Sequence, residues 1–134
     1  MSEISDYVSQ GKDNPPILGI KEYNSYSFET PKDTGTGTNF KEMLIYDISI
    51  LNSTALPALA HDSLLFANVS DDTIGQILAL YAREKQKQIF IAFDREGNYD
   101  KVAQSIIREN TVLKLDADGQ ALFGRKWSRK DVAK

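Results

Sequence analysis

Residues 56–66, with the sequence LPALAHDSLLF, decide the fold that we predict for this chain. A short apolar run leads into His61, Asp62 and Ser63, and a second apolar triplet follows at once. Apolar runs of this length usually form a strand that is buried on both faces of a parallel sheet. Open α/β sheets bind their ligands at the carboxyl ends of the strands. We therefore expect Asp62 to lie at a ligand-binding edge of such a sheet.

Helical and extended patterns alternate around this strand. The predicted helices are residues 39–51, 70–87 and 100–107, and the further predicted strands are residues 88–93 and 111–115. Ser70 and Asp100 are the expected N-caps of the second and third helix. The alternation predicts an α/β fold whose mainly parallel sheet has right-handed crossovers and helices on both faces, which makes three layers.

Smaller elements flank this unit. At the N-terminal end we predict a short helix at residues 2–10 and two strands, 17–20 and 23–28, paired antiparallel through a turn at Lys21 and Glu22. Near the other end, residues 120–123 are expected to pair back on residues 111–115 as a hairpin. The predicted organisation is a helical or linker segment at 1–13, one lobe at 14–130 and a tail at 131–134.

The composition excludes several kinds of site. The 134 residues contain no cysteine, so thiol catalysis, disulfides and cysteine-bound zinc are excluded. Because His61 is the single histidine, a multi-histidine metal site is excluded as well. The net charge of −3 gives no global basic field for nucleic acid or membranes. Without a signal-peptide pattern or a run near the ~20 apolar residues of a membrane span, we expect a cytoplasmic protein with no membrane partner.

Two aspartates follow predicted neighbouring strands. Asp62 ends the strand in residues 56–66, and Asp94 ends the strand at 88–93. Both side chains should emerge at one edge of the sheet, where two carboxylates suit Mg²⁺, a hard cation that takes oxygen ligands and keeps waters for a phosphate substrate. Alternatively, each aspartate only caps the turn after its strand, which is a common role.

A glycine-rich loop precedes the first of the central helices. Its residues, the candidate phosphate contacts, are Asp33, Thr34, Gly35, Thr36, Gly37 and Thr38. Glycines allow close backbone approach, hydroxyls donate hydrogen bonds, and the helix behind the loop, capped by Thr38 or Asn39, offers N–H groups to an anion. The loop lacks the Gly-Lys-Ser/Thr ending of a Walker A motif and the Rossmann spacing. The alternative is a flexible loop without a ligand.

His61 and Ser63 are the candidate catalytic pair. Histidine exchanges protons readily near neutral pH, so His61 is a candidate general base. In an extended strand, residues 61 and 63 share a face, which allows His61 to activate Ser63 as a nucleophile, although no glycine elbow supports this role. The alternative is a packed or capping histidine.

The order of these parts resembles the C-terminal lobe of an ABC-type ATPase head, as in the SMC, RecF and RecN group. More closely, the segments DTGTGT, LPALAHDSLLF, KQKQIFIAFD and LFGRKW are similar to a family of uncharacterised domains. These domains form the C-terminal ends of long, coiled-coil SMC-like ATPases of bacteria, some of them linked to phage defence. The resemblance extends over residues 14–130.

This resemblance implies roles for particular residues. Residues 33–38 would stand in place of the signature loop, which contacts the γ-phosphate of a nucleotide on the opposite head. Asp62 would be the Walker B aspartate that orders Mg²⁺. Gln88, a candidate nucleotide contact, would begin the strand that leads to the switch position of the nucleotide site. In two departures, Ser63 replaces the usual catalytic glutamate, and the usual switch histidine falls near Phe93. No Walker A lysine occurs in the chain, so it would lie in an N-terminal lobe.

The leading expectation is an ATPase subdomain that is inactive alone, because phosphate positioning depends mainly on Walker A and Mg²⁺. ATP and Mg²⁺ would bind only in the complete head. Its partners would be an N-terminal lobe with a coiled coil, a second head and DNA through the whole complex, and exposed apolar surface is expected to favour homo-oligomers. Two alternatives stay open: a free-standing Mg²⁺-dependent phosphoesterase or nuclease that uses Asp62, Asp94 and Glu96, and a non-catalytic interaction domain.

Overall fold

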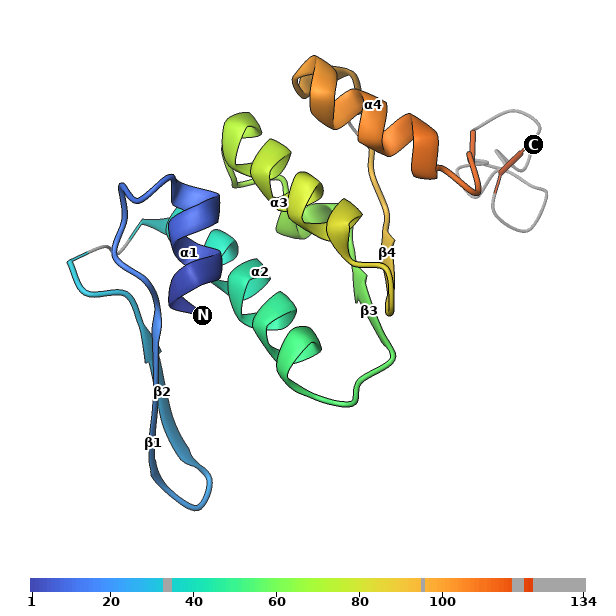
Figure 1. The fold of residues 1–134 in the computed structure, drawn as a ribbon. Coiled ribbons are helices and arrows are strands. Elements are labelled where there is room, and N and C mark those ends of the chain that lie inside the picture. The colour runs from blue at the N-terminus through green and yellow to red at the C-terminus, as the bar shows by residue number, and fades with distance from the viewer. Residues whose placement is uncertain (33–34, 95, 117–119, 122–134) are drawn as a thin grey trace, which may run out of the picture.

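Helices and two separate strand pairs make up the described part of the chain, residues 1–32, 35–94, 96–116 and 120–121 of a computed structural model (Figure 1). The helices are α1 (Ser2–Ser9), α2 (Thr36–Ser53), α3 (Asp71–Arg83) and α4 (Lys101–Asn110). The strands are β1 (Ile17–Glu22), β2 (Ser25–Glu29), β3 (Ala58–His61) and β4 (Gln88–Ile91), and two 3-10 turns are η1 (Ser63–Leu65) and η2 (Glu96–Asn98). This arrangement confirms the α/β class.

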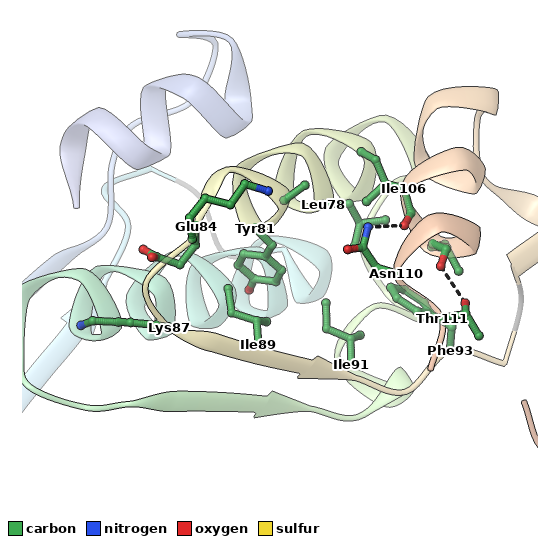
Figure 2. A pocket seen from close by; sticks show the side chains of 13 residues that line it. Leu78, Tyr81, Glu84, Lys87, Ile89, Ile91, Phe93, Ile106, Asn110 and Thr111 are labelled. Carbon is green, nitrogen blue, oxygen red and sulfur yellow. Dashed lines mark hydrogen bonds between the residues drawn. The ribbon is translucent and has the colours of Figure 1, made fainter. Parts of the chain in front are cut away.

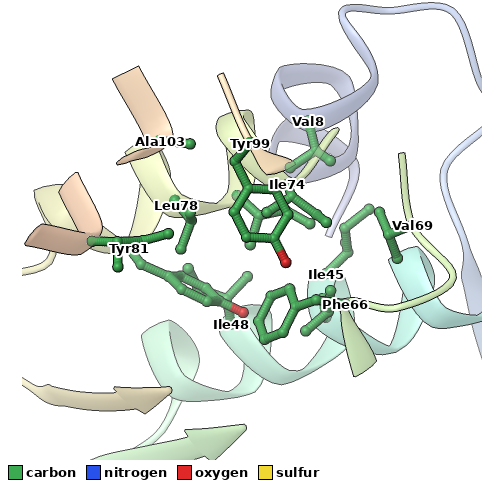
Figure 3. Close-up of a cluster of buried hydrophobic side chains, with 13 residues drawn as sticks. Val8, Ile45, Ile48, Phe66, Val69, Ile74, Leu78, Tyr81, Tyr99 and Ala103 are labelled. Atoms are coloured by element: carbon green, nitrogen blue, oxygen red, sulfur yellow. The ribbon is translucent and has the colours of Figure 1, made fainter. Parts of the chain in front are cut away.

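One cluster of buried apolar side chains joins all four helices (Figure 3). Its members are Val8 from α1, Leu44, Ile45 and Ile48 from α2, Ile74, Ile77, Leu78 and Tyr81 from α3, Ala103 and Ile107 from α4, and Phe66, Val69 and Tyr99 from the connections. Side chains three and four residues apart share one face of a helix, so the spacing in the sequence becomes the core face of the structure. Ser70 and Asp100 cap α3 and α4 as predicted, by accepting from Thr73 N and Ala103 N.

β3 and β4 pair in parallel, as the alternation of elements predicts. The register joins Ala58 to Gln88 and His61 to Ile91, and Ala92 N continues the ladder by donating to the carbonyl oxygen of His61 at 3.1 Å. Ile91 packs against the core cluster, whereas Phe90, on the other face of the pair, is 55% exposed. The helices thus cover one face of this sheet and leave the other to solvent within the described residues.

The third strand of the predicted sheet, residues 111–115, is absent from the described structure. Val112 there is 94% exposed. A strand needs a neighbouring edge to complete its hydrogen bonds, and no strand pairs with this segment among the described residues. The described part therefore contains a parallel pair covered on one face rather than the expected three-layer sheet. A backbone bond joins Asp116 N to Gln120 O, while residues 117–119 of the predicted turn, residues 122–123 of the hairpin and the tail lie outside the described residues.

β1 and β2 form an antiparallel hairpin that projects from the helical body (Figure 1). The turn falls at Tyr23 and Asn24, two residues later than predicted. Asn24 has a φ of 63°, a left-handed conformation that asparagine tolerates better than most residues, so the turn forms there and not at Lys21 and Glu22.

Lys87 links the C-terminal end of α2 to the start of β4 through hydrogen bonds. Its Nζ donates to the carbonyl oxygen of Leu51 and, at 2.7 Å, to that of Thr54. The last carbonyls of a helix have no intrahelical partner and carry partial negative charge, so a cation is well placed there. None of the described helices is both long and apolar enough to cross a membrane.

Candidate functional site

His61, the last residue of β3, lies inside the protein between two helices. The residue is 5% exposed. Its Nε2 lies 3.1 Å from Oδ2 of Asp47 on α2, and its Nδ1 lies 3.2 Å from the hydroxyl oxygen of Tyr81 on α3. The ring also meets Phe66 edge to face, with the centroids 6.0 Å apart. Both ring nitrogens are therefore engaged by the protein itself.

The burial of Tyr81 keeps its phenol protonated. Desolvation, and to a smaller extent the charge of Asp47, raise the pKa of Tyr81 well above its ordinary value. In the His61 tautomer whose Nε2–H donates to the Asp47 carboxylate, Nδ1 accepts the hydrogen bond of the Tyr81 hydroxyl. The network holds the end of β3 to α2 and α3.

Ser63 makes no contact with His61 that would form a catalytic pair. Its hydroxyl donates to Oδ1 of the preceding Asp62, at 3.2 Å. The 3-10 turn η1 begins at Ser63, so the chain has left the extended conformation in which residues 61 and 63 share a face. In this geometry neither ring nitrogen of His61 is placed to take the Ser63 proton.

Asp62 and Asp94 occupy the carboxyl edge of the parallel pair. Asp62 directly follows β3, Asp94 comes three residues after β4, and both are exposed. Because the register aligns His61 with Ile91, the two aspartates follow the same end of the sheet. Within the described ranges no group of three or more acidic or histidine side chains is gathered for a metal ion. A cation at Asp62 would therefore need oxygen ligands from water, phosphate or another polypeptide.

The glycine loop supplies the first turn of α2. Gly35 is the N-cap, three residues before the predicted Thr38, and Thr36 and Gly37 are already helical. A Cβ on Gly37 would lie 2.7 Å from the carbonyl oxygen of Asn68, so a side chain there would collide with the segment after η1. This close approach explains why the helix begins inside the loop. Asp33 and Thr34 lie outside the described residues.

The glycine loop and the His61 network meet α2 at different levels. Asp47, which holds His61, follows Thr36 by eleven residues, and the 1.5 Å rise per residue puts about 16 Å of helix between them. Gln88 begins β4 opposite Ala58, at the amino end of the pair, whereas Asp62 follows the carboxyl end.

A separate pocket of about 270 Å³ lies between α3, β4 and α4 (Figure 2). Its floor is apolar and includes Leu78, Ile89 and Ile91. Among its polar groups, Glu84 and Lys87 lie near one end and Asn110 and Thr111 near the other (Figure 2). Neither Asp62 nor Asp94 lines it. This pocket is therefore distinct from the strand-end site.

Over residues 4–127 the chain matches a family described as an uncharacterised protein conserved in bacteria, DUF2326. The chain belongs to this family. No curated protein and no solved structure matches it.

In the DUF2326 chain, Asp47 and Tyr81 bind the ring nitrogens of His61 at the end of β3. These two partners were not predicted from the sequence. Tyr81 continues the buried stripe of Ile74, Ile77 and Leu78, which is the pattern of an ordinary core residue. Asp47 interrupts the apolar pattern next to Ile48. A carboxylate beside a core position is the signal that could have indicated a buried partner such as the single histidine.

Proposed function

We propose that this chain is the C-terminal lobe of an ABC-type head of an SMC-like coiled-coil ATPase. In this proposal residues 33–38 act as a signature-like loop and Asp62 acts as a Walker B-like aspartate. The lobe is inactive until a Walker A-bearing lobe joins it, with the coiled coil, a second head and DNA as further partners of the assembled complex. The observation that carries the proposal is the incomplete parallel sheet with Asp62 at its carboxyl end.

A parallel pair of this kind is unusual as a finished structure. Parallel strands are normally buried on both faces, and two strands alone make a marginal sheet. Here Phe90 is exposed on the uncovered face, and neither β3 nor β4 has a second neighbouring strand among the described residues. Strands and helices from another lobe would complete the predicted three-layer sheet and place it beside Asp62.

A two-head site would divide the work of the loop and the aspartate. In the resembled heads the signature loop acts on the nucleotide of the opposite head, so loop and Walker B aspartate of one lobe serve different nucleotides. Asp62 is exposed to a metal ion, and its Oδ1 accepts from the Ser63 hydroxyl. Ser63 in place of a glutamate predicts slow hydrolysis, because a general base is missing at that position.

A second candidate, a Mg²⁺-dependent phosphoesterase, is favoured by the shared edge of Asp62 and Asp94. It would use Glu96 as a third acid, but Oε1 of Glu96 lies 3.5 Å from Nε of Arg108. Titration of the isolated chain with Mg²⁺ separates the two candidates. A two-aspartate phosphoesterase should bind the metal without a partner, whereas the ATPase lobe should not.

ATP turnover is the direct test. The isolated chain should hydrolyse ATP no faster than buffer, and addition of a lobe with Walker A and coiled coil, encoded beside it, should give Mg²⁺-dependent turnover. Asp62→Ala should lower that turnover about 100-fold or more, because metal stabilisation of the transition state is several kcal/mol. Asp72→Ala, an exposed aspartate on α3, is the matched control. ATP hydrolysis by the isolated chain that Asp62→Ala removes would contradict the proposal.

A further inference from the structure

The hairpin and α2 enclose a cavity of about 710 Å³ that the proposed ATPase role does not use. Leu18 and Ile20 of β1 are paired with Phe28 and Tyr26 of β2, so one face of the hairpin is apolar and aromatic. This face lines the cavity together with the polar residues Glu22, Asn24 and Ser25 near the hairpin turn, opposite Asn39, Glu42, Met43 and Tyr46 of α2. These four residues follow the spacing i, i+3, i+4 and i+7, which places them on one stripe of the helix.

Glu42, on the α2 side of the cavity, is unexpected because it is an acidic residue and yet is buried. The residue is only 3% exposed, and its Oε1 is buried with no hydrogen-bond partner among the described residues. The neighbouring lysine, Lys41, is bound elsewhere, because its Nζ lies 2.6 Å from Oδ2 of Asp13. A buried carboxylate oxygen without a partner is disfavoured, and a cationic donor in the cavity that Glu42 lines would offset that penalty.

The walls around Glu42 suit a planar cation. Phe28 and Tyr46 pack edge to face, with ring centroids 5.4 Å apart, and both line the cavity. Aromatic faces attract cations, and a guanidinium both stacks on such rings and binds a carboxylate through two parallel hydrogen bonds. Arginine is therefore the side chain whose shape and charge fit this combination best.

The exposed apolar residues at the rim of the cavity indicate the kind of molecule to which the cation belongs. Ile20 and Tyr26 line the cavity yet are 78% and 75% exposed, and Met43 beside Glu42 is exposed too. A small cation would leave this apolar surface in water, whereas a polypeptide with apolar residues beside an arginine would cover it. We propose that the cavity between the hairpin and α2 binds an arginine side chain of a partner polypeptide, flanked by apolar residues, through Glu42.

The test uses two short peptides, acetyl-Leu-Arg-Leu-amide and its glutamine counterpart, acetyl-Leu-Gln-Leu-amide, with methylguanidinium as a third probe. Binding to the full chain is followed by amide chemical shifts in NMR titrations. The arginine peptide should shift amides of the hairpin and α2 and bind about tenfold or more tightly than the glutamine peptide, as expected for a charge pair shielded from water. Methylguanidinium, without the apolar flanks, should bind more weakly than the arginine peptide.

Variants of the cavity make the test specific. Glu42→Gln should abolish the preference for arginine, whereas Glu29→Gln, an exposed change on β2 outside the cavity, should leave it intact. Met43→Arg offers a second variant at an exposed position, and its own guanidinium beside Glu42 should block the peptide. Equal binding of the two peptides, an arginine preference that survives Glu42→Gln, or methylguanidinium binding as tight as the peptide would each overturn the proposal.

Discussion

Nε2 of His61 lies 3.1 Å from Oδ2 of Asp47, and this contact ties the last residue of β3 to the middle of α2. His61→Ala would remove it and would also leave the Tyr81 hydroxyl without its partner. We expect a loss of about 2–4 kcal/mol in the free energy of unfolding, because the buried Tyr81 hydroxyl and the partly buried Asp47 carboxylate lose hydrogen bonds and a small cavity forms. Urea denaturation measures the loss. Asp47→Asn, which keeps a hydrogen-bonding group, should cost less, and a wild-type midpoint for His61→Ala would contradict the structural role of the network.

Tyr81 makes the stability of the protein sensitive to alkaline pH. Its pKa is raised in the folded protein by burial and then by Asp47, whereas in the unfolded chain it is the ordinary value of about 10. Below about pH 10 both states keep the proton, so the contribution is fully present. Above it the unfolded state loses the proton first and binds fewer protons, so stability falls with a slope of about 1.4 kcal/mol per pH unit.

Unfolding of wild type and Tyr81→Phe between pH 8 and 11.5 isolates this effect. The difference in unfolding free energy between the two proteins should be constant below about pH 10 and should shrink above it. Tyr23→Phe, at an exposed position in the hairpin turn, is the matched control and should follow wild type. A difference between wild type and Tyr81→Phe that stays constant up to pH 11.5 would be inconsistent with a buried, protonated phenol.

Gly37 should tolerate no side chain. A Cβ there would stand 2.7 Å from the carbonyl oxygen of Asn68, and backbone cannot move aside as a flexible side chain would. Gly37→Ala should therefore lower stability by about 1–3 kcal/mol, although alanine normally favours a helix. Gly97→Ala is the control, because a Cβ at Gly97 meets nothing within 4 Å. Thermal unfolding of both variants tests this prediction. A Gly37→Ala protein that is more stable than the wild type would show that the loop does not pack against Asn68.

Phe90 should promote self-association of the isolated chain. It stands on the uncovered face of the parallel pair, and exposed apolar surface of this kind favours association. Phe90→Asp should lower the average mass measured by sedimentation at high protein concentration. Leu64→Asp changes an even more exposed apolar residue, on η1, and should have little effect. A wild-type monomer at every concentration would contradict this prediction.

Local signals predicted the helices well, because a cap such as Ser70 or Asp100 and an apolar stripe act within a few residues of the helix they define. The parallel pairing of β3 and β4 followed from the order of elements. The prediction of a strand at residues 111–115 was wrong because an apolar run becomes a strand only where a neighbouring edge accepts its hydrogen bonds. The hairpin turn was misplaced for a smaller reason, the left-handed conformation of Asn24.

The candidate site was predictable only in its exposed part. Asp62 and Asp94 lie at the carboxyl edge because strand direction puts them there. The partners of His61 come from positions 14 residues before it and 20 residues after it, and such contacts depend on how α2 and α3 pack. The cavity beside Glu42 was missed for the same reason, since its two walls are separate in the sequence.

α2 is attached along its whole length: Gly37 at its start, Asp47 at its middle, and the carbonyls bound by Lys87 at its end. A helix fixed at three levels does not hinge or fray independently of its supports. In hydrogen exchange, amides of α2 and β3 should consequently open together, as one cooperative unit. A displacement at the glycine loop would then reach the end of β3 as a rigid-body movement of α2.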